Sequence, residues 1–419
     1  MEKKGFVHTL PFKLICALAV GIVLGLALHV TDTSPLSGVV LNVIVCVKYV
    51  VAQFINFCVP LIIIGFIAPS ITRLGGNASK MLLLAICLAY VSSIGAAFFA
   101  TGSGYIILPH LSISPNVDGL KALPQPVFTL NIPQIMSVMS ALFFSVLVGL
   151  AAAWNSSKYI TNVLEEFQAI VLSIVTKFVI PLLPVLIGTT FCTLSYEGSI
   201  TKQLPIFLII IVLVIIGHYI WLTLLYSIAG AYSGKNPLDI VKNYGPAYMT
   251  AIGTMSSAAT LSVALKCAQK SEPPLRDDLV SFGIPLFANI HLCGSVLTET
   301  FFVMAVSKML YGGFPSVEKM ILFCLLLGVF AIGAPGVPGG TVMASLGLIT
   351  SVIGFDDTGT ALMLTIFALQ DSFGTACNVT GDGALTLILT GYAEKHGVKE
   401  NSPEVLQAAA AREENERSM

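Results

Sequence analysis

Four polar side chains recur at helical spacing in an otherwise apolar stretch near the C-terminus. They are Asp371, Thr375, Asn378 and Asp382. Intervals of four, three and four residues place them on one face of a helix. Their carboxylate, hydroxyl and amide oxygens suit an ammonium group and a hard cation. Because two carboxylates make a polar helix–helix seam expensive, the stripe predicts a binding site rather than such a seam.

A second polar face lies upstream and carries His291, Ser295 and Glu299 at intervals of four residues. Pro285 and the small residues nearby predict a break in this helix. A broken helix exposes carbonyl oxygens to cations and a half-helix N-terminus to anions. A further histidine on an apolar segment, His218, is interpreted as a packed, hydrogen-bonded core residue.

The elements that must position these residues have a membrane composition. The chain has 419 residues, of which 56% are hydrophobic and 10% charged, whereas soluble domains carry about 25% charged residues. The net charge of −1 offers no basic patch to a nucleic acid, so no nucleic-acid partner is expected. The nine cysteines show no CxxC pairing and are interpreted as small hydrophobic residues.

Eight segments are long and apolar enough to cross a bilayer, which takes roughly 20 residues per helix. The predicted spans are residues 12–30, 38–71, 81–108, 127–153, 165–192, 204–232, 279–307 and 357–393. The first apolar run lacks a small-residue cleavage site and leads into further spans. It is therefore interpreted as a transmembrane helix and not as a removed signal peptide.

Two further segments, 245–266 and 318–353, are apolar at both ends and small or polar in the centre. Each arm has about 10–14 apolar residues, which is too few to cross a bilayer. Irregular backbone at membrane depth is tolerated only where protein or a wet cavity satisfies it. Both segments are therefore predicted to be re-entrant helical hairpins with functional tips; a kinked ordinary helix or a surface loop is the alternative for each.

The basic residues indicate the orientation. With both hairpins not crossing, one side receives Lys3, Lys4, Arg73, Lys80, Lys158, Lys235, Lys242, Lys266, Lys270, Arg276, Lys395 and Lys399. The other side receives only Lys121, Lys202, Lys308 and Lys319. The excess predicts that the first side is cytoplasmic. The chain is therefore expected to lie in a cell membrane with both termini in the cytoplasm.

The two hairpin centres, the broken helix and the Asn-Val-Thr-Gly-Asp stretch at 378–382 together resemble the dicarboxylate/amino acid:cation symporter family. This family includes glutamate transporters and neutral amino-acid exchangers, and the resemblance spans residues 10–395. It implies an all-α fold of eight transmembrane helices plus two re-entrant hairpins, assembled as a homotrimer in the lipid bilayer.

The same resemblance implies a division of labour along the chain. Residues 10–75 (spans 1 and 2) and 125–196 (spans 4 and 5) match the scaffold that holds the trimer. Residues 78–108 (span 3) and 203–395 (span 6, both hairpins, spans 7 and 8) match a transport domain that moves like an elevator. Residues 396–419 are expected to form a cytoplasmic tail.

The resemblance also implies an amino-acid site in which Asp371 binds the substrate ammonium. The backbone around Ser256, Ser257 and Val337 matches the cradle for the α-carboxylate. The expected substrate site comprises Ser256, Ser257, Ser295, Val337, Gly340, Thr341, Asp371, Gly374, Thr375 and Asn378. Two sodium sites are implied beside it, one at Asn378 and Asp382 with the carbonyls of Phe287 and His291. The other uses the carbonyls of Asn289, Ala331, Ile332 and Ala334.

Gly374 departs from the family's acidic-substrate members, which carry an arginine four residues before the motif's asparagine. Without a guanidinium, a second substrate carboxylate would be buried unpaired. Asp371 is retained, so the predicted substrate is a small neutral amino acid resembling serine, threonine or alanine. The Leu369–Ser372 run also resembles bacterial serine/threonine symporters, and Gly374 is expected to leave room for a larger side chain. The alternative is a dicarboxylate or acidic amino-acid symporter whose cation comes from elsewhere.

The family's NMDG motif is also altered, because His291 replaces its asparagine and Cys293 its aspartate. This change predicts that one further sodium site is absent or weakened. Glu299 stands where animal glutamate transporters have a proton-carrying glutamate, and His291, with an ordinary pKa of about 6.5, can share that role. The hypothesis is that H⁺ coupling replaces part of the Na⁺ coupling; the alternative is that Glu299 is a static acid.

Other functional classes fit the sequence less well. A channel needs a continuous pore ring rather than a polar stripe between two hairpins. An enzyme needs a nucleophile–base pair or a motif such as HExxH, and ATP-driven transport needs a Walker A sequence; the chain has neither motif. Asp371 and Asp382 lie about 16 Å apart along a helix, too far for a catalytic acid pair.

Overall fold

A computed structural model of the chain describes residues 10–31, 34–74, 80–111, 113, 121, 123–128, 132–155, 157–198, 200–271, 275–334 and 336–398. Throughout these ranges the regular secondary structure is helical, and no strand occurs in them. The predicted cytoplasmic tail, 396–419, lies almost wholly outside the described residues.

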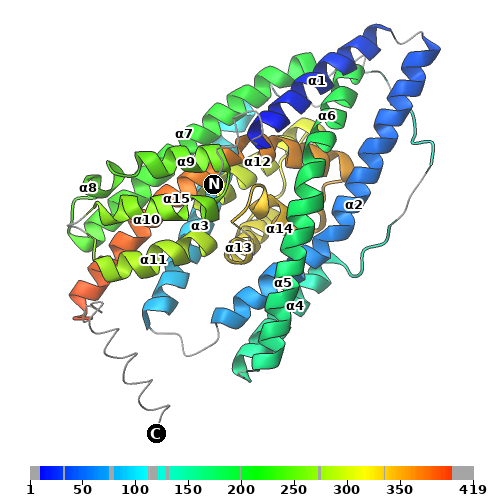
Figure 1. The fold of residues 1–419 in the computed structure, drawn as a ribbon. Helices are drawn as coiled ribbons and strands as arrows, with labels where there is room; N and C mark the ends of the chain where they lie inside the picture. Colours follow the sequence, from blue (N-terminus) through cyan, green and yellow to red (C-terminus); the bar gives the residue numbers. More distant parts are fainter. Residues whose placement is uncertain are drawn as a thin grey trace.

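The helices follow the predicted spans and hairpins in order (Figure 1). They are α1 (Leu10–Val30), α2 (Pro35–Leu74), α3 (Lys80–Ile107), α4 (Val138–Trp154), α5 (Lys158–Ile174), α6 (Ile180–Glu197), α7 (Ile200–Ser233), α8 (Leu238–Val241), α9 (Gly245–Thr254), α10 (Ser257–Gln269), α11 (Asp277–Ile290), α12 (Cys293–Tyr311), α13 (Val317–Gly333), α14 (Gly340–Leu348) and α15 (Asp357–Lys395). A short 3-10 turn, η2 (Leu108–His110), extends α3, and two π-helical turns, η3 (Val175–Val179) and η4 (Ile349–Ile353), continue α5 into α6 and extend α14.

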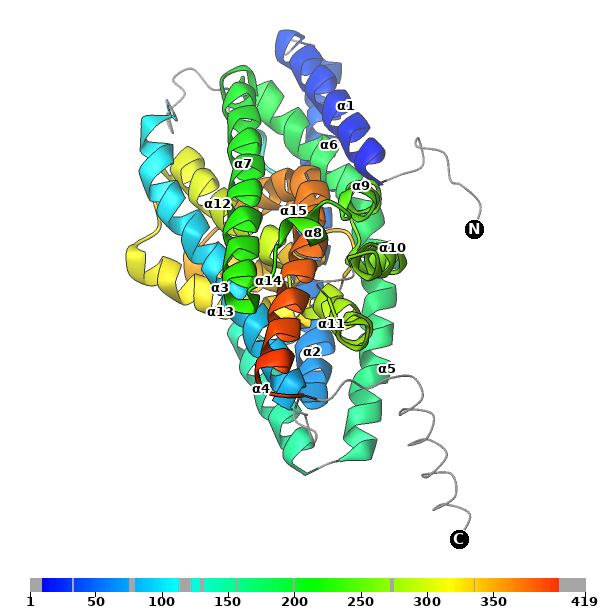
Figure 2. The same cartoon turned by 90° about the vertical axis from the view of Figure 1, so that its left-hand side faces the viewer.

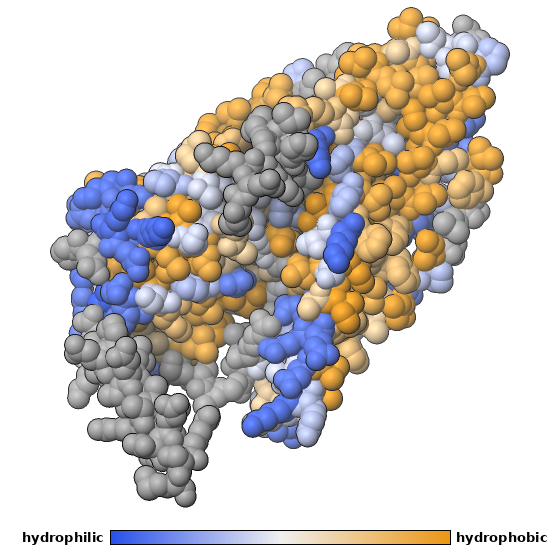
Figure 3. All heavy atoms as spheres, viewed as in Figure 1, coloured by the Kyte–Doolittle hydropathy of each residue, from blue (hydrophilic) through white to orange (hydrophobic). Residues whose placement is uncertain are grey.

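Within the described ranges, six helical stretches are long and apolar enough to cross a membrane. They are Phe12–Val30, Pro35–Pro69, Lys80–His110, Lys158–Glu197, Pro205–Ser233 and Asp277–Tyr311. Figure 3 shows hydrophobic side chains over α1, α2 and α6 and hydrophilic ones gathered over α8. The chain is therefore a multi-pass helical membrane protein.

The predicted span 127–153 is wrong in its first part, because α4 begins only at Val138. Ser137 ends the preceding irregular segment and caps the helix by accepting the backbone N–H of Ser140 at 3.2 Å. Pro133, which removes a backbone donor, also lies in this segment. Residues 129–131 of that prediction lie outside the described residues.

Both predicted hairpins consist of two helical arms that pack against each other. In the first, Met255 (φ 53°) and Ser256 join α9 to α10, and Ser256 caps α10 by accepting the N–H of Ala259 at 3.2 Å. In the second, Ala334 and residues 336–339 lie between α13 and α14, and Gly339 (φ 72°) adopts the left-handed backbone that glycine tolerates best. The ten residues of α9 rise only about 15 Å, half a bilayer core.

The helices pack in two groups. In one group, α1 packs on α6 and α2 packs on α4, α5 and α6. In the other, α15 runs through the interior and is contacted by α7, α9, α10, α11 and α12, while α3 packs on α12 and α13 (Figure 2). The polar stripe of α15 therefore lies at the centre of the second group, where lipid cannot reach it.

Candidate functional site

The break between α11 and α12 falls at His291 and Leu292, where the backbone leaves the helical region. This break confirms the predicted interruption of the span; Pro285 itself lies inside α11, six residues before His291. The side chain of Leu292 cannot cap α12, so the first N–H groups of that helix need partners from elsewhere.

Asn378 of α15 supplies those partners. Its Oδ1 accepts the backbone N–H of Gly294 at 2.7 Å and that of Ser295 at 3.1 Å. Its Nδ2 donates to the Ser295 hydroxyl at 2.8 Å. The Asn378 carboxamide therefore caps the N-terminus of α12 from a neighbouring helix. It also links Asn378 to Ser295, two of the predicted site residues, and one N–H of its amide group remains for another ligand.

His291 and Asp382 form a buried pair at the broken helix. His291 Nδ1 lies 2.9 Å from Asp382 Oδ1, and His291 Nε2 lies 2.9 Å from the hydroxyl of Ser92 in α3. Gly381 makes room for the ring, since a Cβ there would lie 2.9 Å from His291 Cε1. Within the part of the chain that the structure describes, Asp382 Oδ2 is buried without a hydrogen-bond partner. An orphaned buried carboxylate oxygen is a fitting ligand for a cation.

Asp371 lies where both hairpin tips meet. Its Oδ2 accepts the backbone N–H of Gly339, in the second hairpin, at 2.7 Å. The hydroxyl of Ser256, in the first hairpin, donates to the carbonyl oxygen of Gly336 at 2.6 Å. The structure thus brings together the two tips and the acidic stripe, three elements that are far apart in the sequence.

The remaining predicted substrate residues surround this meeting point. Val337 accepts the N–H of Gly340 at 2.9 Å and so shapes the second tip. The other members are buried near the starts of their helices or on α15: Ser257 in α10, Ser295 in α12, Gly340 and Thr341 in α14, and Gly374 and Thr375 in α15.

The open space expected beside Gly374 is absent. A Cβ at Gly374 would lie 3.3 Å from Ser295 Cα and 3.4 Å from Ser295 N. The expectation was wrong because the two helices need this glycine for their close approach, and the backbone of α12 fills the volume that a longer residue would use.

The carbonyl groups predicted for sodium lie at two helix C-termini. Ala331 and Ile332 end α13, and the tip beyond it passes close to α11, since a Cβ at Gly336 would lie 3.6 Å from the Ala288 carbonyl oxygen. Helix C-termini carry partial negative charge and favour cations. The Phe287 carbonyl accepts the N–H of His291 at 2.8 Å and keeps its second lone pair.

Two more predicted sodium ligands lie near the C-termini of α11 and α13. Ala334 directly follows α13 and is buried, whereas Asn289 is exposed near the end of α11 and uses its side chain to donate to the Pro285 carbonyl at 2.7 Å. The Asn289 side chain is thus bonded to Pro285 and not to its own backbone carbonyl, which is the group predicted to bind sodium.

Glu299 is fully buried in α12 and accepts a hydrogen bond from the hydroxyl of Ser345 in α14. Its Oε2 has no partner among the described residues. Ser345 and Ser92 were both missed from sequence, since a single serine in an apolar helix gives no sign of its partner. His218 bonds to the Gly294 carbonyl at 3.0 Å and the Thr298 hydroxyl at 2.9 Å, as expected of a core histidine.

Fold and site together define a helical membrane protein with an oxygen-rich polar centre beneath two hairpin tips. The chain belongs to the sodium:dicarboxylate symporter family, because residues 10–392 match the sequence model of that family. This match confirms the resemblance inferred from the hairpin centres and the 378–382 stretch. The members of the family are secondary transporters and not enzymes.

Relatives within the family carry different names. The chain is 28% identical to the serine/threonine transporter SstT of Streptococcus agalactiae over 75% of this chain and 76% of that protein. It is 26% identical to the excitatory amino acid transporter 2 of Mus musculus, over 59% and 43%. It is 26% identical to the neutral amino acid transporter B(0) of Macaca fascicularis, over 46% and 35%.

The aligned region covers only part of several animal relatives. It spans 43% of the mouse excitatory transporter and 52% of a putative sodium-dependent excitatory amino acid transporter, glt-4, of Caenorhabditis elegans. These relatives therefore support the family, while the substrate of this chain must be inferred from its own site.

Proposed function

We propose that this protein is a secondary active transporter that carries a small neutral amino acid into the cell together with a cation. One observation carries the proposal: the carboxylate of Asp371 is buried at the junction of both hairpin tips and is held by a backbone N–H of Gly339. A substrate ammonium can take the place of that N–H when the second tip withdraws.

Position 374 favours a neutral substrate over an acidic one. Gly374 brings no guanidinium to the site, and its Cα packs against α12. Arg276 is engaged elsewhere, because it pairs with Asp278 at 2.7 Å and donates to the Val398 carbonyl at 2.8 Å. The aligned serine/threonine transporter, which covers the largest share of this chain among the relatives named above, points to the same substrate class.

Sodium is the proposed main coupling ion. Asp382 offers a carboxylate oxygen that has no hydrogen-bond partner in the described part of the chain, and Asn378 lies one turn before it. The carbonyl-rich ends of α11 and α13 provide the oxygens that a hard cation prefers. We place one ion at Asp382 and the backbone carbonyls of Asn378, Phe287 and His291, because the Asn378 Oδ1 already accepts two N–H groups. A second is placed at the carbonyls of Asn289, Ala331, Ile332 and Ala334.

A proton is the proposed second coupling ion, and Glu299 is its carrier. This carboxyl is buried, and its partner Ser345 lies on the arm of the second hairpin, so its environment changes when that hairpin moves. His291, the other candidate, has both ring nitrogens engaged by Asp382 and Ser92. We therefore assign His291 to the positioning of Asp382 and leave proton transfer to Glu299.

The proposed architecture has eight membrane spans and two re-entrant hairpins, with both termini in the cytoplasm. In this scheme the group of α1, α2, α4, α5 and α6 is the static scaffold of a homotrimer in the cell membrane. The group around α15 is the body that moves as an elevator. Native mass spectrometry of the detergent-purified protein should give the mass of a trimer.

Uptake into proteoliposomes tests the function. With an inward sodium gradient, labelled serine, threonine or alanine should accumulate, and collapse of the gradient should abolish accumulation. Uptake of aspartate or succinate in their place would favour the alternative, an acidic-substrate symporter, which the family's description and the excitatory relatives suggest.

A further inference from the structure

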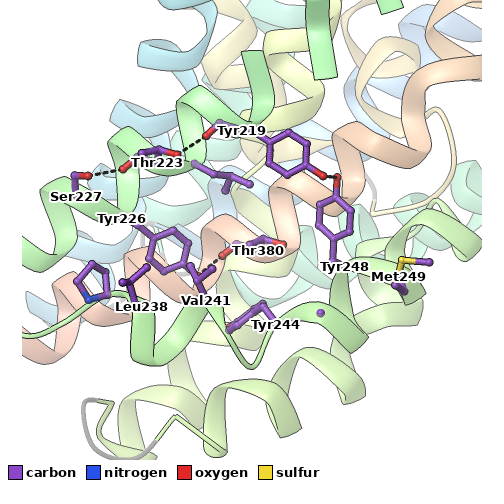
Figure 4. A pocket seen from close by; sticks show the side chains of 13 residues that line it. Tyr219, Thr223, Tyr226, Ser227, Leu238, Val241, Tyr244, Tyr248, Met249 and Thr380 are labelled. Atoms are coloured by element: carbon purple, nitrogen blue, oxygen red, sulfur yellow. Dashed lines mark hydrogen bonds between the residues drawn. The ribbon is translucent and has the colours of Figure 1, made fainter. Parts of the chain in front are cut away.

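A cavity separate from the polar site lies between α7, α8 and the α9 arm of the first hairpin (Figure 4). It encloses about 440 Å³, within the range of about 300–1,000 Å³ that is usual for small-molecule sites. Tyr219 and Thr223 of α7 face Tyr248 and Met249 of α9 across it, and Leu238 of α8 lies at its edge. The cavity thus separates a membrane-length helix from a hairpin arm.

Most polar groups of the wall are already hydrogen-bonded within the protein. The hydroxyls of Tyr219 and Tyr248 bond to each other at 3.0 Å, and the Tyr226 hydroxyl donates to the Thr380 carbonyl at 2.8 Å. Thr223 donates to the Tyr219 carbonyl, one turn earlier in α7, at 2.8 Å. A ligand with hydrogen-bonding groups would find few partners here, whereas an unbranched hydrocarbon would need none.

Two further lining residues differ in this respect. The Ser227 hydroxyl donates to the Thr223 carbonyl at 2.7 Å. The Tyr244 hydroxyl is buried without a hydrogen-bond partner among the described residues, and its ring points toward α15, since a Cβ at Gly383 would lie 2.8 Å from Tyr244 Cζ. The surface offered to an occupant is therefore mainly aromatic and aliphatic carbon.

The cavity opens toward lipid. The outward face of α7 is a row of exposed apolar side chains: Leu208, Ile209, Val212, Ile216, Tyr219, Ile220, Leu224 and Ile228. Tyr219, which is 52% exposed, belongs to both this row and the cavity wall, and Leu238 and Met249 at the rim are 67% and 66% exposed. Since α7 has the length and composition of a membrane span, this rim meets the hydrocarbon of the bilayer.

The polar end of the cavity lies near the membrane–water interface. Beside α8, Lys242 pairs with Asp239 at 2.7 Å, and Lys235, just after α7, pairs with Glu394 at 2.5 Å. Charged pairs and tyrosines at the end of a span are typical of the headgroup level. A chain attached to a headgroup at this level can enter the cavity without crossing a polar barrier.

We infer that this cavity is a binding site for an acyl chain of a bilayer phospholipid, seated between α7 and the α9 arm of the first hairpin. The chain fills the seam between the two elements, so its presence restrains movement of α9 relative to α7. Because α9 leads directly to Ser256 at the tip, the lipid is coupled to the polar site through one rigid arm.

Photolabelling in proteoliposomes tests this site. Two phosphatidylcholine probes are compared, one with a diazirine in the middle of an acyl chain and one with a diazirine on the headgroup. In the wild-type protein the acyl probe should label Tyr248 and Met249 several-fold more strongly than the exposed face of α7 at Leu224 and Ile228. The headgroup probe should not label them.

Two pocket-filling variants sharpen the test. Thr223→Phe and Ser227→Phe place a ring in the cavity, whereas the matched controls Leu224→Phe and Ile228→Phe place it on the adjacent lipid-facing side. Labelling of Tyr248 and Met249 should fall to the level of the exposed face in both filling variants and remain in both controls. If one filling variant does not fold, the other carries the comparison.

Three outcomes would overturn the site. They are wild-type labelling of Tyr248 and Met249 no stronger than that of the exposed face, equal labelling by the headgroup probe, and labelling that the filling variants leave unchanged. None of these readouts depends on transport, so the result is independent of the substrate and coupling ion proposed above.

Discussion

The two carboxylates of the α15 stripe have different surroundings. Asp371 is held by a backbone N–H of a hairpin tip, at Gly339. Asp382, about 16 Å further along the same helix, is held by the side chain of His291, which is itself anchored by Ser92 of α3. One partner belongs to a short glycine-rich link and the other to the packed interior.

This difference indicates how the stripe divides its work. A backbone N–H on a tip can leave Asp371 and find water, so the carboxylate can exchange it for a substrate ammonium. The His291 ring has no comparable alternative, because it is fully buried and its two nitrogens face Asp382 of α15 and Ser92 of α3. In the proposed scheme Asp382 keeps this partner, and its second oxygen, which has no partner among the described residues, is the one that binds the coupling ion.

The largest expected effect is that of Asp371→Asn. The variant retains an acceptor for Gly339 but loses the charge that pairs with the ammonium. A buried charge pair that loses one partner costs about 2–5 kcal/mol, so substrate affinity should fall roughly 30-fold or more. Equilibrium binding of the substrate at saturating sodium measures this. Unchanged affinity would refute the assignment of Asp371.

Asp382→Asn should separate the two carboxylates. We expect sodium affinity to fall, because a charged ligand becomes neutral; the loss of one charged interaction is worth about 1.5–3 kcal/mol. Substrate affinity at saturating sodium should change much less than in Asp371→Asn. Sodium titrations of both variants, monitored by substrate binding, provide the comparison. Equal effects of the two substitutions on substrate affinity would show that Asp371 and Asp382 do not differ in role.

The close contact between α12 and α15 at Gly294 should tolerate no added volume. In Gly294→Ala the new Cβ would overlap the Cβ of Cys377 and approach the Gly374 carbonyl oxygen, so α12 and α15 must move apart. Overpacking of this kind costs about 1–3 kcal/mol. The matched control is Gly102→Ala in α3, where no atom of the described residues lies within 4 Å of the new Cβ. A thermal denaturation series should show a lower midpoint for the first variant alone.

The smallest effect on binding is expected for Glu299→Gln. Its amide oxygen can still accept the Ser345 hydroxyl, so the free energy of unfolding should change by less than about 1 kcal/mol. The side chain can no longer bind or release a proton. Transport rates measured from pH 5 to 9 should therefore lose a pH dependence that the wild type shows, and an identical profile in both proteins would indicate a static acid.

Helix order and both hairpins could be predicted because apolar length and small polar centres are local signals. The polar stripe was predictable for the same reason, since Asp371, Thr375, Asn378 and Asp382 share one helix. Long-range partners were not predictable. Nothing in the sequence around Asn378 shows that it caps α12, and nothing around Ser92 shows that it meets His291.

The break between α11 and α12 was predicted, but its exact position was not: it falls at His291 and Leu292, where Asp382, Ser92 and Asn378 provide distant contacts. The room expected beside Gly374 was predicted wrongly, because α12 approaches so closely that Ser295 occupies the space. Packing between helices decided both features, and a single sequence contains no record of that packing.

Thermal stabilisation of the purified protein by ligands tests the central claim most directly. The screen uses all twenty amino acids, succinate and fumarate, each with and without sodium, since a ligand that binds the native state raises its apparent stability by mass action. We predict stabilisation by serine, threonine or alanine only in the presence of sodium. Stabilisation by aspartate or succinate, with none by neutral amino acids, would contradict the assignment of a neutral substrate to the site at Asp371 and Gly374.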